Sequence, residues 1–277
     1  MRDNALPVTE MAEALKSREL LVNRPEMRKS RPELADAHCH IESLSREVLK
    51  ESIDYGVKVI VANGVDLTSN LKTLSMSDGI NVFAAIGVHP EYSGTISDDD
   101  LEKNMQLARD NRSLIVAIGE IGIDRKFAAN ERALERQKLV FERLVELAIE
   151  LGLPVCVHTR DALADALEIL ELKGAKRVQL HFFEGDVEQA KYVAGLGYMV
   201  SIPPMESSRR KRVIKAVPMQ NLLAETDAPV NNAVPKDVEK SIAMIAAAKG
   251  IGFDEAAAAL MQNTRRFFNI RMSNLMR

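Results

Sequence analysis

The chain has 277 residues, enough for one large α/β domain or for two average ones. Its hydrophobic (46%) and charged (28%) fractions are ordinary for a globular protein, and a net charge of −3 gives no general attraction to nucleic acid or anionic membranes. Two cysteines outside any zinc-finger spacing exclude a disulfide framework, and the lack of a signal-type start or long apolar run predicts a cytoplasmic protein with no membrane partner.

Residues 1–32 differ from the rest of the chain. Apolar residues from Thr9 to Leu21 have a loose helical spacing, and the segment then becomes basic and is broken by Pro25 and Pro32. We expect a helical N-terminal extension, followed by a main domain over 33–277. Packing on the outside of the core is the simplest role for the extension. There are two alternatives. The extension could be a dimerisation arm that makes a homo-oligomer, or it could be a basic contact for a polyanionic substrate.

From Leu34 onward, short apolar and β-branched segments alternate with segments of helical spacing. This alternation is typical of parallel strands that are buried on both faces and joined by helices. Strands are predicted at 34–40, 57–65, 81–88, 114–118, 154–159, 177–182, 198–202 and 221–224. Helices are predicted at about 43–55, 67–76, 97–111, 130–151, 161–172, 186–196, 206–217, 237–249 and 254–268. The pattern predicts an α/β fold, a (β/α)8 TIM-type barrel with an N-terminal helical extension. A doubly wound open sheet is the alternative, but the glycine-rich phosphate turn after its first strand is missing.

Ligand-type side chains gather at the C-terminal ends of these strands. All the histidines of the chain lie there, together with two carboxylates, and the set is His38, His40, His89, Glu120, His158, His181 and Asp227. The C-terminal strand ends of a barrel converge on one mouth, so these residues become neighbours. Histidines placed only for packing should also occur elsewhere in the chain. Imidazole and carboxylate donors suit Zn²⁺, Mn²⁺ or a similar ion, and the set exceeds what one tetrahedral ion uses, so a two-metal site is predicted.

Motifs around these residues occur in a fixed order along the chain. They lie at 36–40, 87–90, 119–124, 136–141, 154–160, 181–185, 225–229 and 263–267. In these motifs the chain resembles the TatD family of metal-dependent deoxyribonucleases, within the amidohydrolase superfamily. The resemblance spans about 36–268. It implies a TIM-type barrel, two divalent metal ions (Zn²⁺, Mg²⁺ or Mn²⁺) and hydrolysis of phosphodiesters or related esters.

The resemblance also implies a role for each site residue. The implied metal ligands are His38, His40, Glu120, His158, His181 and Asp227. Glu120 bridges the two ions, His158 and His181 hold the second, and the others hold the first. The resemblance further implies that His89 and Arg160 face substrate oxygens. From the residue types we expect Asp227 to orient the attacking water and take its proton, and His89 to bind the phosphate or assist the leaving group.

Three features depart from the family pattern and bear on substrate preference. Glu184 stands where family members usually carry Ser before a glycine, 125–127 replaces a stretch that commonly contains aromatic residues, and the N-terminal extension is unusual. A basic run at 209–212, with Lys215, follows the seventh strand. A solvated helix face explains such a run, but its start lies near the mouth, where it could meet nucleic-acid phosphates.

We therefore expect a hydrolase that cleaves DNA phosphodiesters through a metal-activated water. An amide, lactone or aminoacyl-ester hydrolase with the same binuclear site is the alternative, and a barrel that only binds metal or serves as a scaffold is a third reading. Glu120 stands where many amidohydrolases use a carboxylated lysine, and this favours the TatD-like branch. Cys39 should face the helices and Cys156 the barrel interior, so neither is expected to act as a nucleophile.

Overall fold

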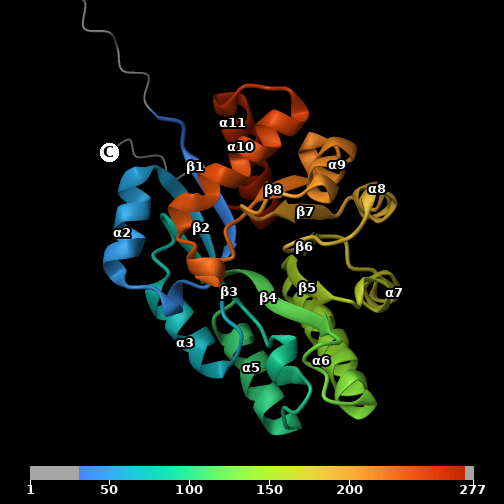
Figure 1. The fold of residues 1–277 in the computed structure, drawn as a ribbon. Helices are drawn as coiled ribbons and strands as arrows, with labels where there is room; N and C mark the ends of the chain where they lie inside the picture. Colours follow the sequence, from blue (N-terminus) through green and yellow to red (C-terminus); the bar gives the residue numbers. More distant parts are fainter. Residues whose placement is uncertain (1–30, 272–277) are drawn as a thin grey trace, which may run out of the picture. The chain divides into compact units, whose positions relative to one another are not determined.

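Eight parallel strands form the central sheet of the computed structural model, which describes residues 31–271 (Figure 1). Each strand pairs with the next one along the chain. The strands are β1 Leu34–Cys39, β2 Val57–Asn63, β3 Val82–Ile86, β4 Ile115–Asp124, β5 Val155–Arg160, β6 Val178–Leu180, β7 Met199–Ile202 and β8 Leu222–Ala224. Strand order equal to sequence order confirms the predicted TIM-type barrel, because a doubly wound sheet reverses its order in the middle.

The two ends of the sheet meet where β1 and β8 finish. The backbone N–H of Asp227 donates to the carbonyl of His38 at 2.9 Å, and the N–H of His40 donates to the carbonyl of Ala228 at 2.7 Å. The carboxylate of Asp36 accepts hydrogen bonds from the backbone N–H and the hydroxyl of Thr226, at 2.8 and 2.6 Å. The barrel is therefore joined beside two of the predicted metal ligands.

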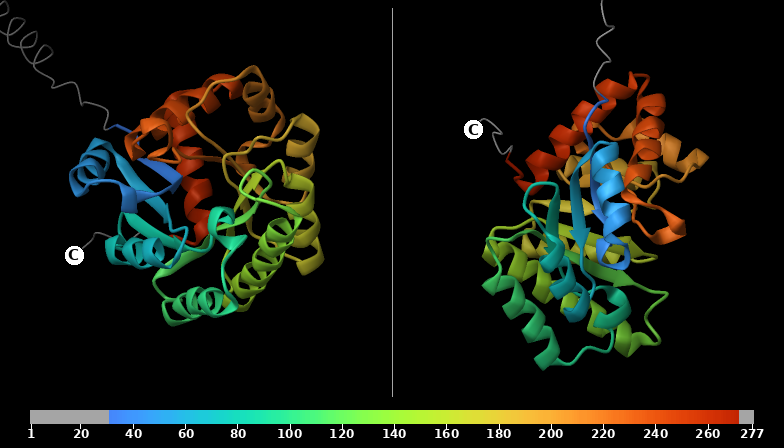
Figure 2. Two further views of the ribbon diagram at one scale, coloured as in Figure 1. Left: turned by 60° about the horizontal axis from the view of Figure 1, so that its bottom comes forward. Right: turned by 90° about the vertical axis from the view of Figure 1, so that its left-hand side faces the viewer.

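Helices surround the strands, as Figure 2 shows from two further directions. The longer ones are α2 Arg46–Tyr55, α3 Leu67–Met76, α5 Asp98–Asp110, α6 Glu131–Leu151, α7 Leu163–Lys173, α8 Val187–Gly195, α9 Ser208–Ala216, α10 Val238–Lys249 and α11 Phe253–Phe268. Short turns of helix are η1 Ile41–Ser43, α4 Pro90–Ser93, η2 Met219–Asn221, η3 Val230–Asn232 and η4 Pro235–Asp237. Along the described part of the chain, no helix combines the length and the apolar character that a membrane crossing requires.

Capping residues explain several helix ends. Ser97 caps α5 through its hydroxyl, and three aspartates follow in the first turn, as predicted. Gly152 ends α6 in the left-handed conformation, with φ of +64°. The prediction that a helix begins near residue 43 is wrong, because the side chain of Ser45 caps α2 and residues 41–43 form a separate 3-10 turn.

Two groups of buried apolar side chains stabilise the barrel. The larger group lies between strands and outer helices and includes Phe141 of α6 and Cys39 of β1. The smaller group contains small strand residues, Cys156 of β5, and Phe267 and Phe268 of α11. The two cysteines thus lie in different layers, as predicted.

Strand β4 is longer than predicted. The sequence predicts a strand over 114–118, but β4 continues to Asp124 because residues 121–124 pair with residues 157–160 of β5. An irregularity between Ile118 and Ile121 interrupts the register. The predicted N-terminal extension, and the self-association assigned to it, lie outside the described residues except for positions 31 and 32.

Candidate metal centre

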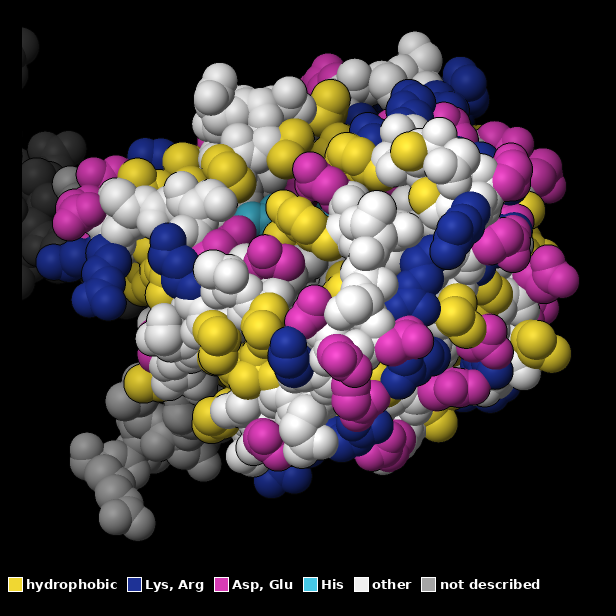
Figure 3. Space-filling model, turned by 90° about the horizontal axis from the view of Figure 1, so that it is seen from below, with side chains coloured by type: hydrophobic (Ala, Val, Ile, Leu, Met, Phe, Trp, Pro, Cys, Tyr) yellow, Lys and Arg dark blue, Asp and Glu magenta, His cyan; other side chains and the backbone are white. Residues whose placement is uncertain are grey.

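The predicted site residues come together at the C-terminal ends of the strands. All of them except His38 line a cavity of about 450 Å³, together with Phe127, Phe182 and Glu184. Seen from below in Figure 3, a histidine side chain is visible at the bottom of a recess, with acidic and hydrophobic side chains around it. The lining of the cavity includes His89, His158, Arg160 and Asp227.

The end of β1 directs His38 and His40 to the same place. Ala35 and Ala37 belong to the inner apolar group, whereas Cys39 belongs to the outer one. Strict alternation would place all three on one face, but the register of β1 shifts between Asp36 and Cys39. The two imidazoles lie next to one another, with ring centroids 5.1 Å apart.

Glu120 stands at the centre of the cluster and its two oxygens face different partners. Oε2 lies 3.5 Å from Nε2 of His38 and 3.4 Å from Nε2 of His40. Oε1 lies 3.0 Å from Nδ1 of His158 and 3.2 Å from Nε2 of His181. Nε2 of His89 also lies 3.5 Å from Oε1, so one carboxylate separates two imidazoles at Oε2 from three at Oε1.

Asp227 completes the side of the cluster that contains His38 and His40. Its Oδ1 lies 3.7 Å from Nε2 of His38 and 3.3 Å from Nε2 of His40. The backbone of Asp227 has φ of +56°, a conformation that costs a non-glycine residue about 1 kcal/mol or more. Hydrogen bonds between the neighbouring Thr226 and Asp36 hold it there.

The donor set fits divalent metal ions. Tetrahedral coordination at Zn–N distances of about 2.0–2.1 Å sets neighbouring donors about 3.4 Å apart, close to the separations around Glu120. Both ring nitrogens of His38 are buried and lack a hydrogen-bond partner among the described residues, a cost that a bound cation would remove. His38 with His40 and Glu120, and Glu120 with His89 and His158, each bring their ligand atoms within 4.8 Å of one another.

Outer contacts fix three of the imidazoles in the orientation that a metal ligand needs. Nδ1 of His40 donates to the carbonyl of Asn63 at 2.9 Å. Nε2 of His158 and Nδ1 of His181 face the carboxylates of Asp124 and Glu225, at 2.8 and 3.4 Å. The remaining ring nitrogen of each histidine faces Glu120, and such outer partners usually set the tautomer of a metal-binding imidazole.

Burial and charge act in opposite directions on these groups. Burial alone would raise the pKa of Glu120, but the histidines around it, His89 and His181 first, hold that pKa well below its usual range. Burial also opposes protonation of His181, yet the charges of Glu225 and Glu120 raise its pKa. His89 follows burial, which lowers its pKa to about 4 despite the charge of Glu120. His89 is therefore neutral near pH 7.

Two buried carboxylates that the sequence did not single out as site residues support the cluster. Asp124 binds both His158 and Nε of Arg160, the latter at 3.0 Å, and the guanidinium of Arg160 lies 4.7 Å from the centroid of the Phe127 ring. Glu225 accepts from the backbone N–H of Phe182 at 2.6 Å, in addition to its contact with His181. Asp124 lies in the motif 119–124 and Glu225 in the motif 225–229, each within four positions of a predicted metal ligand. This closeness in sequence was the signal that could have identified them as site residues.

Comparison with known proteins agrees with this arrangement. A family model described as TatD related DNase matches residues 35–269. The chain is 31% identical over 250 residues to an uncharacterized metal-dependent hydrolase of Methanocaldococcus jannaschii, covering 86% of this chain and 97% of that protein. It is 30% identical over 259 residues to the human deoxyribonuclease TATDN3, covering 85% and 94% of the two chains.

Solved structures show the same relationship. The crystal structure of YJJV, a TatD homolog from Escherichia coli, superposes with a TM-score of 0.78 at 26% identity and covers 86% of this chain and 98% of that one. The family model spans the whole strand order of the barrel, from β1 to α11. This chain therefore belongs to the TatD family of metal-dependent hydrolases.

Proposed function

We propose that this TatD-family hydrolase cleaves phosphodiester bonds of DNA with two divalent metal ions bound at the Glu120 cluster. The division of the two Glu120 oxygens between two groups of imidazoles carries the proposal. A bridging carboxylate between two ions is the usual core of two-metal sites that act on phosphodiesters. The name of the human relative, a deoxyribonuclease, supports the choice of DNA.

The proposed ligands follow from the geometry. His38, His40 and Asp227 would hold one ion, His158 and His181 would hold the other, and Glu120 would contact both. Imidazole with carboxylate favours Zn²⁺ or Mn²⁺ over Mg²⁺, which prefers oxygen ligands. When bound, such ions lower the pKa of a coordinated water and neutralise charge on phosphoryl oxygens.

Three side chains around the cluster would act on the reactants directly. Asp227, whose Oδ1 lies 3.3 Å from Nε2 of His40, orients the attacking water and accepts its proton. The backbone N–H of Glu91 donates to Nδ1 of His89 at 3.1 Å, so the proton of this neutral imidazole is on Nε2, which lies 3.5 Å from Oε1 of Glu120 at the wall of the central cavity. His89 therefore serves as a hydrogen-bond donor to a phosphoryl oxygen, and the guanidinium of Arg160 is held beside it for the same purpose.

Hydrolysis of end-labelled DNA tests the proposal. Metal-stripped protein is supplied separately with Mg²⁺, Mn²⁺ and Zn²⁺ and given single- and double-stranded substrates, beside a Glu120→Ala control. Metal-stimulated cleavage that the control lacks is the expected result, and the fragment ladder distinguishes attack at the ends from internal attack. Tight metal binding without DNA cleavage would refute the choice of substrate and favour a carbonyl ester or amide.

Asp227→Asn tests the assignment of the proton acceptor. The amide keeps an oxygen for the metal but is not basic, so metal content should be largely retained while kcat falls by about 100-fold or more. Metal content is measured by atomic emission and kcat with the DNA substrate. Wild-type turnover in this variant would show that Asp227 does not take the proton.

A further inference from the structure

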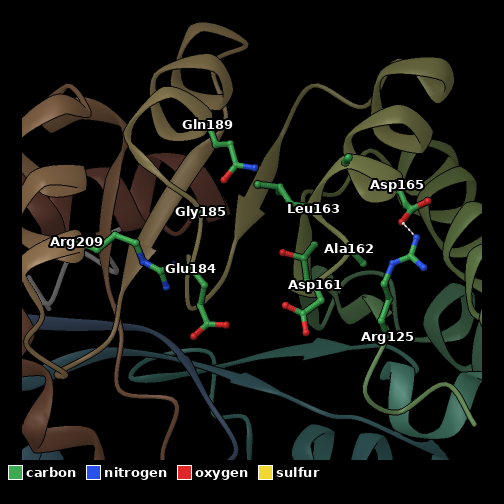
Figure 4. A pocket seen from close by; sticks show the side chains of 11 residues that line it. Arg125, Asp161, Ala162, Leu163, Asp165, Glu184, Gly185, Gln189 and Arg209 are labelled. Atoms are coloured by element: carbon green, nitrogen blue, oxygen red, sulfur yellow. Dashed lines mark hydrogen bonds and ion pairs between the residues drawn. The ribbon is translucent and has the colours of Figure 1, made fainter.

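A second cavity of about 480 Å³ lies beside the candidate metal centre (Figure 4). Its walls come from the segments that follow β4, β5, β6 and β7 on the same face of the barrel. Thr159 and Glu184 line both this side cavity and the central one. The two cavities therefore adjoin one another at these two residues.

Most charged side chains of the side cavity already have an oppositely charged neighbour. Arg125 binds Asp165 at 2.6 Å, and Lys126 lies 3.9 Å from Asp161. Arg209 differs, because it makes no hydrogen bond or ion pair with any residue of the described range 31–271. Its guanidinium is exposed and lies on the same side of the cavity as Glu184 in Figure 4.

The neighbouring residue of the basic run has a structural role. Arg210 is 9% exposed, donates to the carbonyl of Met205, and stands 5.6 Å from the centroid of the Phe182 ring. It thus attaches the start of α9 to the loop after β6. This attachment fixes the backbone beside Arg209 and directs its free guanidinium to the cavity.

The charge around the central cavity gives a direction to a bound polyanion. Glu42 and Glu91 line the side formed by the segments after β1 and β3. Arg160 lines the opposite side, and the side cavity contains Arg125 and Arg209 together with Asp161, Asp165 and Glu184. Asp124 and Asp165 pair with Arg160 and Arg125, so Arg209 is the guanidinium of this group that remains to attract a phosphate.

We propose that the side cavity is a subsite for the nucleotide next to the scissile phosphodiester, and that Arg209 binds the far phosphate of that nucleotide. The inference rests on the proposed function and names the part of the substrate that this function would require. A guanidinium binds phosphate oxygens in a bidentate manner. Glu184 lies where the two cavities adjoin, and its carboxylate repels phosphates there. One phosphate would therefore bind at the metal centre and the other at Arg209, and the uncharged nucleoside would lie between them.

The test compares Arg209→Gln with Arg212→Gln in the metal-loaded protein. Both arginines are exposed residues of α9, but only Arg209 lines the side cavity. For each variant, kcat/KM is measured on a short single-stranded oligodeoxynucleotide and on bis(p-nitrophenyl) phosphate, which has one phosphodiester and no neighbouring nucleotide. We expect Arg209→Gln to lower the ratio of the two values about fivefold, and to reduce the slope of log kcat/KM against log salt for the oligonucleotide by about 0.7. Arg212→Gln should leave both quantities at the wild-type value.

Equal ratios in the two variants, with DNA cleaved normally by the wild type, would overturn the subsite and leave the proposed function intact. Hydrolysis of the model diester but not of DNA by the wild type would overturn the proposed function, and the subsite with it. The wild-type measurement therefore separates the two failures before any variant is compared.

Discussion

Replacing Gly122 with alanine tests how closely β4 must approach β5 for the metal centre to form. Gly122 pairs with His158 and has φ of +149°. A Cβ added there would lie 1.9 Å from the carbonyl oxygen of His158, where real contacts stay beyond 3.0 Å. The strands must therefore separate by about 1 Å, and overpacking of this kind costs ~1–3 kcal/mol. Alanine in this positive-φ conformation costs a further ~1–2 kcal/mol. Together the two costs should lower the free energy of unfolding by about 3 kcal/mol.

The same displacement should weaken metal binding. Nδ1 of His158 lies 3.0 Å from Glu120, so a shift of β5 breaks one side of the cluster, and we expect about 10- to 100-fold lower metal affinity. Urea unfolding and calorimetric metal titration measure the two effects. Gly79→Ala is the matched control, because Gly79 has φ of +65° with no atom within 4 Å of an added Cβ, so only the backbone cost of about 1 kcal/mol applies. If the two variants lost equal stability and bound metal equally well, the steric argument would be refuted.

Three further predictions concern the core, the thiols and the outer contacts of the cluster. Phe141→Ala should lower the free energy of unfolding by about 3–5 kcal/mol in urea, because the ring is 1% exposed; a loss below about 1 kcal/mol would contradict its place in the core. Cys39 and Cys156 are fully buried, so a thiol reagent should modify them only after unfolding, and rapid labelling of the folded protein would show that these layers open. Asp124→Asn should weaken metal binding about 10-fold or more in calorimetry, because it removes the charged partner of His158; unchanged affinity would show that this contact does not orient the imidazole.

Much of the fold was predictable because it depends on local patterns. Buried parallel strands carry continuous β-branched runs, and capping residues such as Ser97 and Gly152 mark helix ends. The boundary of β4 was not predictable in this way. Its second half contains Gly122, and glycine ordinarily weakens a strand. Only pairing with β5 makes residues 121–124 part of it.

The candidate site was predictable for a different reason. The barrel topology brings strand ends together, so residues far apart in sequence can be assigned to one place once the fold class is known. The orientation of each ring was not predictable, because it depends on outer contacts such as that between His40 and the carbonyl of Asn63. The side cavity was also beyond sequence reasoning, since it requires the positions of Arg209 and Glu184 relative to the barrel mouth.

The joint between β1 and β8 has a consequence for the order of folding. Asp36 and Thr226 are 190 positions apart, and their hydrogen bonds lie directly beside His38 and Asp227. Contacts this distant in sequence form late, after local helices and neighbouring strand pairs. A chain emerging from the ribosome would already have most of its helices while the last strand, and with it one carboxylate of the cluster, was still missing. The candidate metal centre would therefore be complete only after β8 has docked, because an unfinished barrel lacks Asp227.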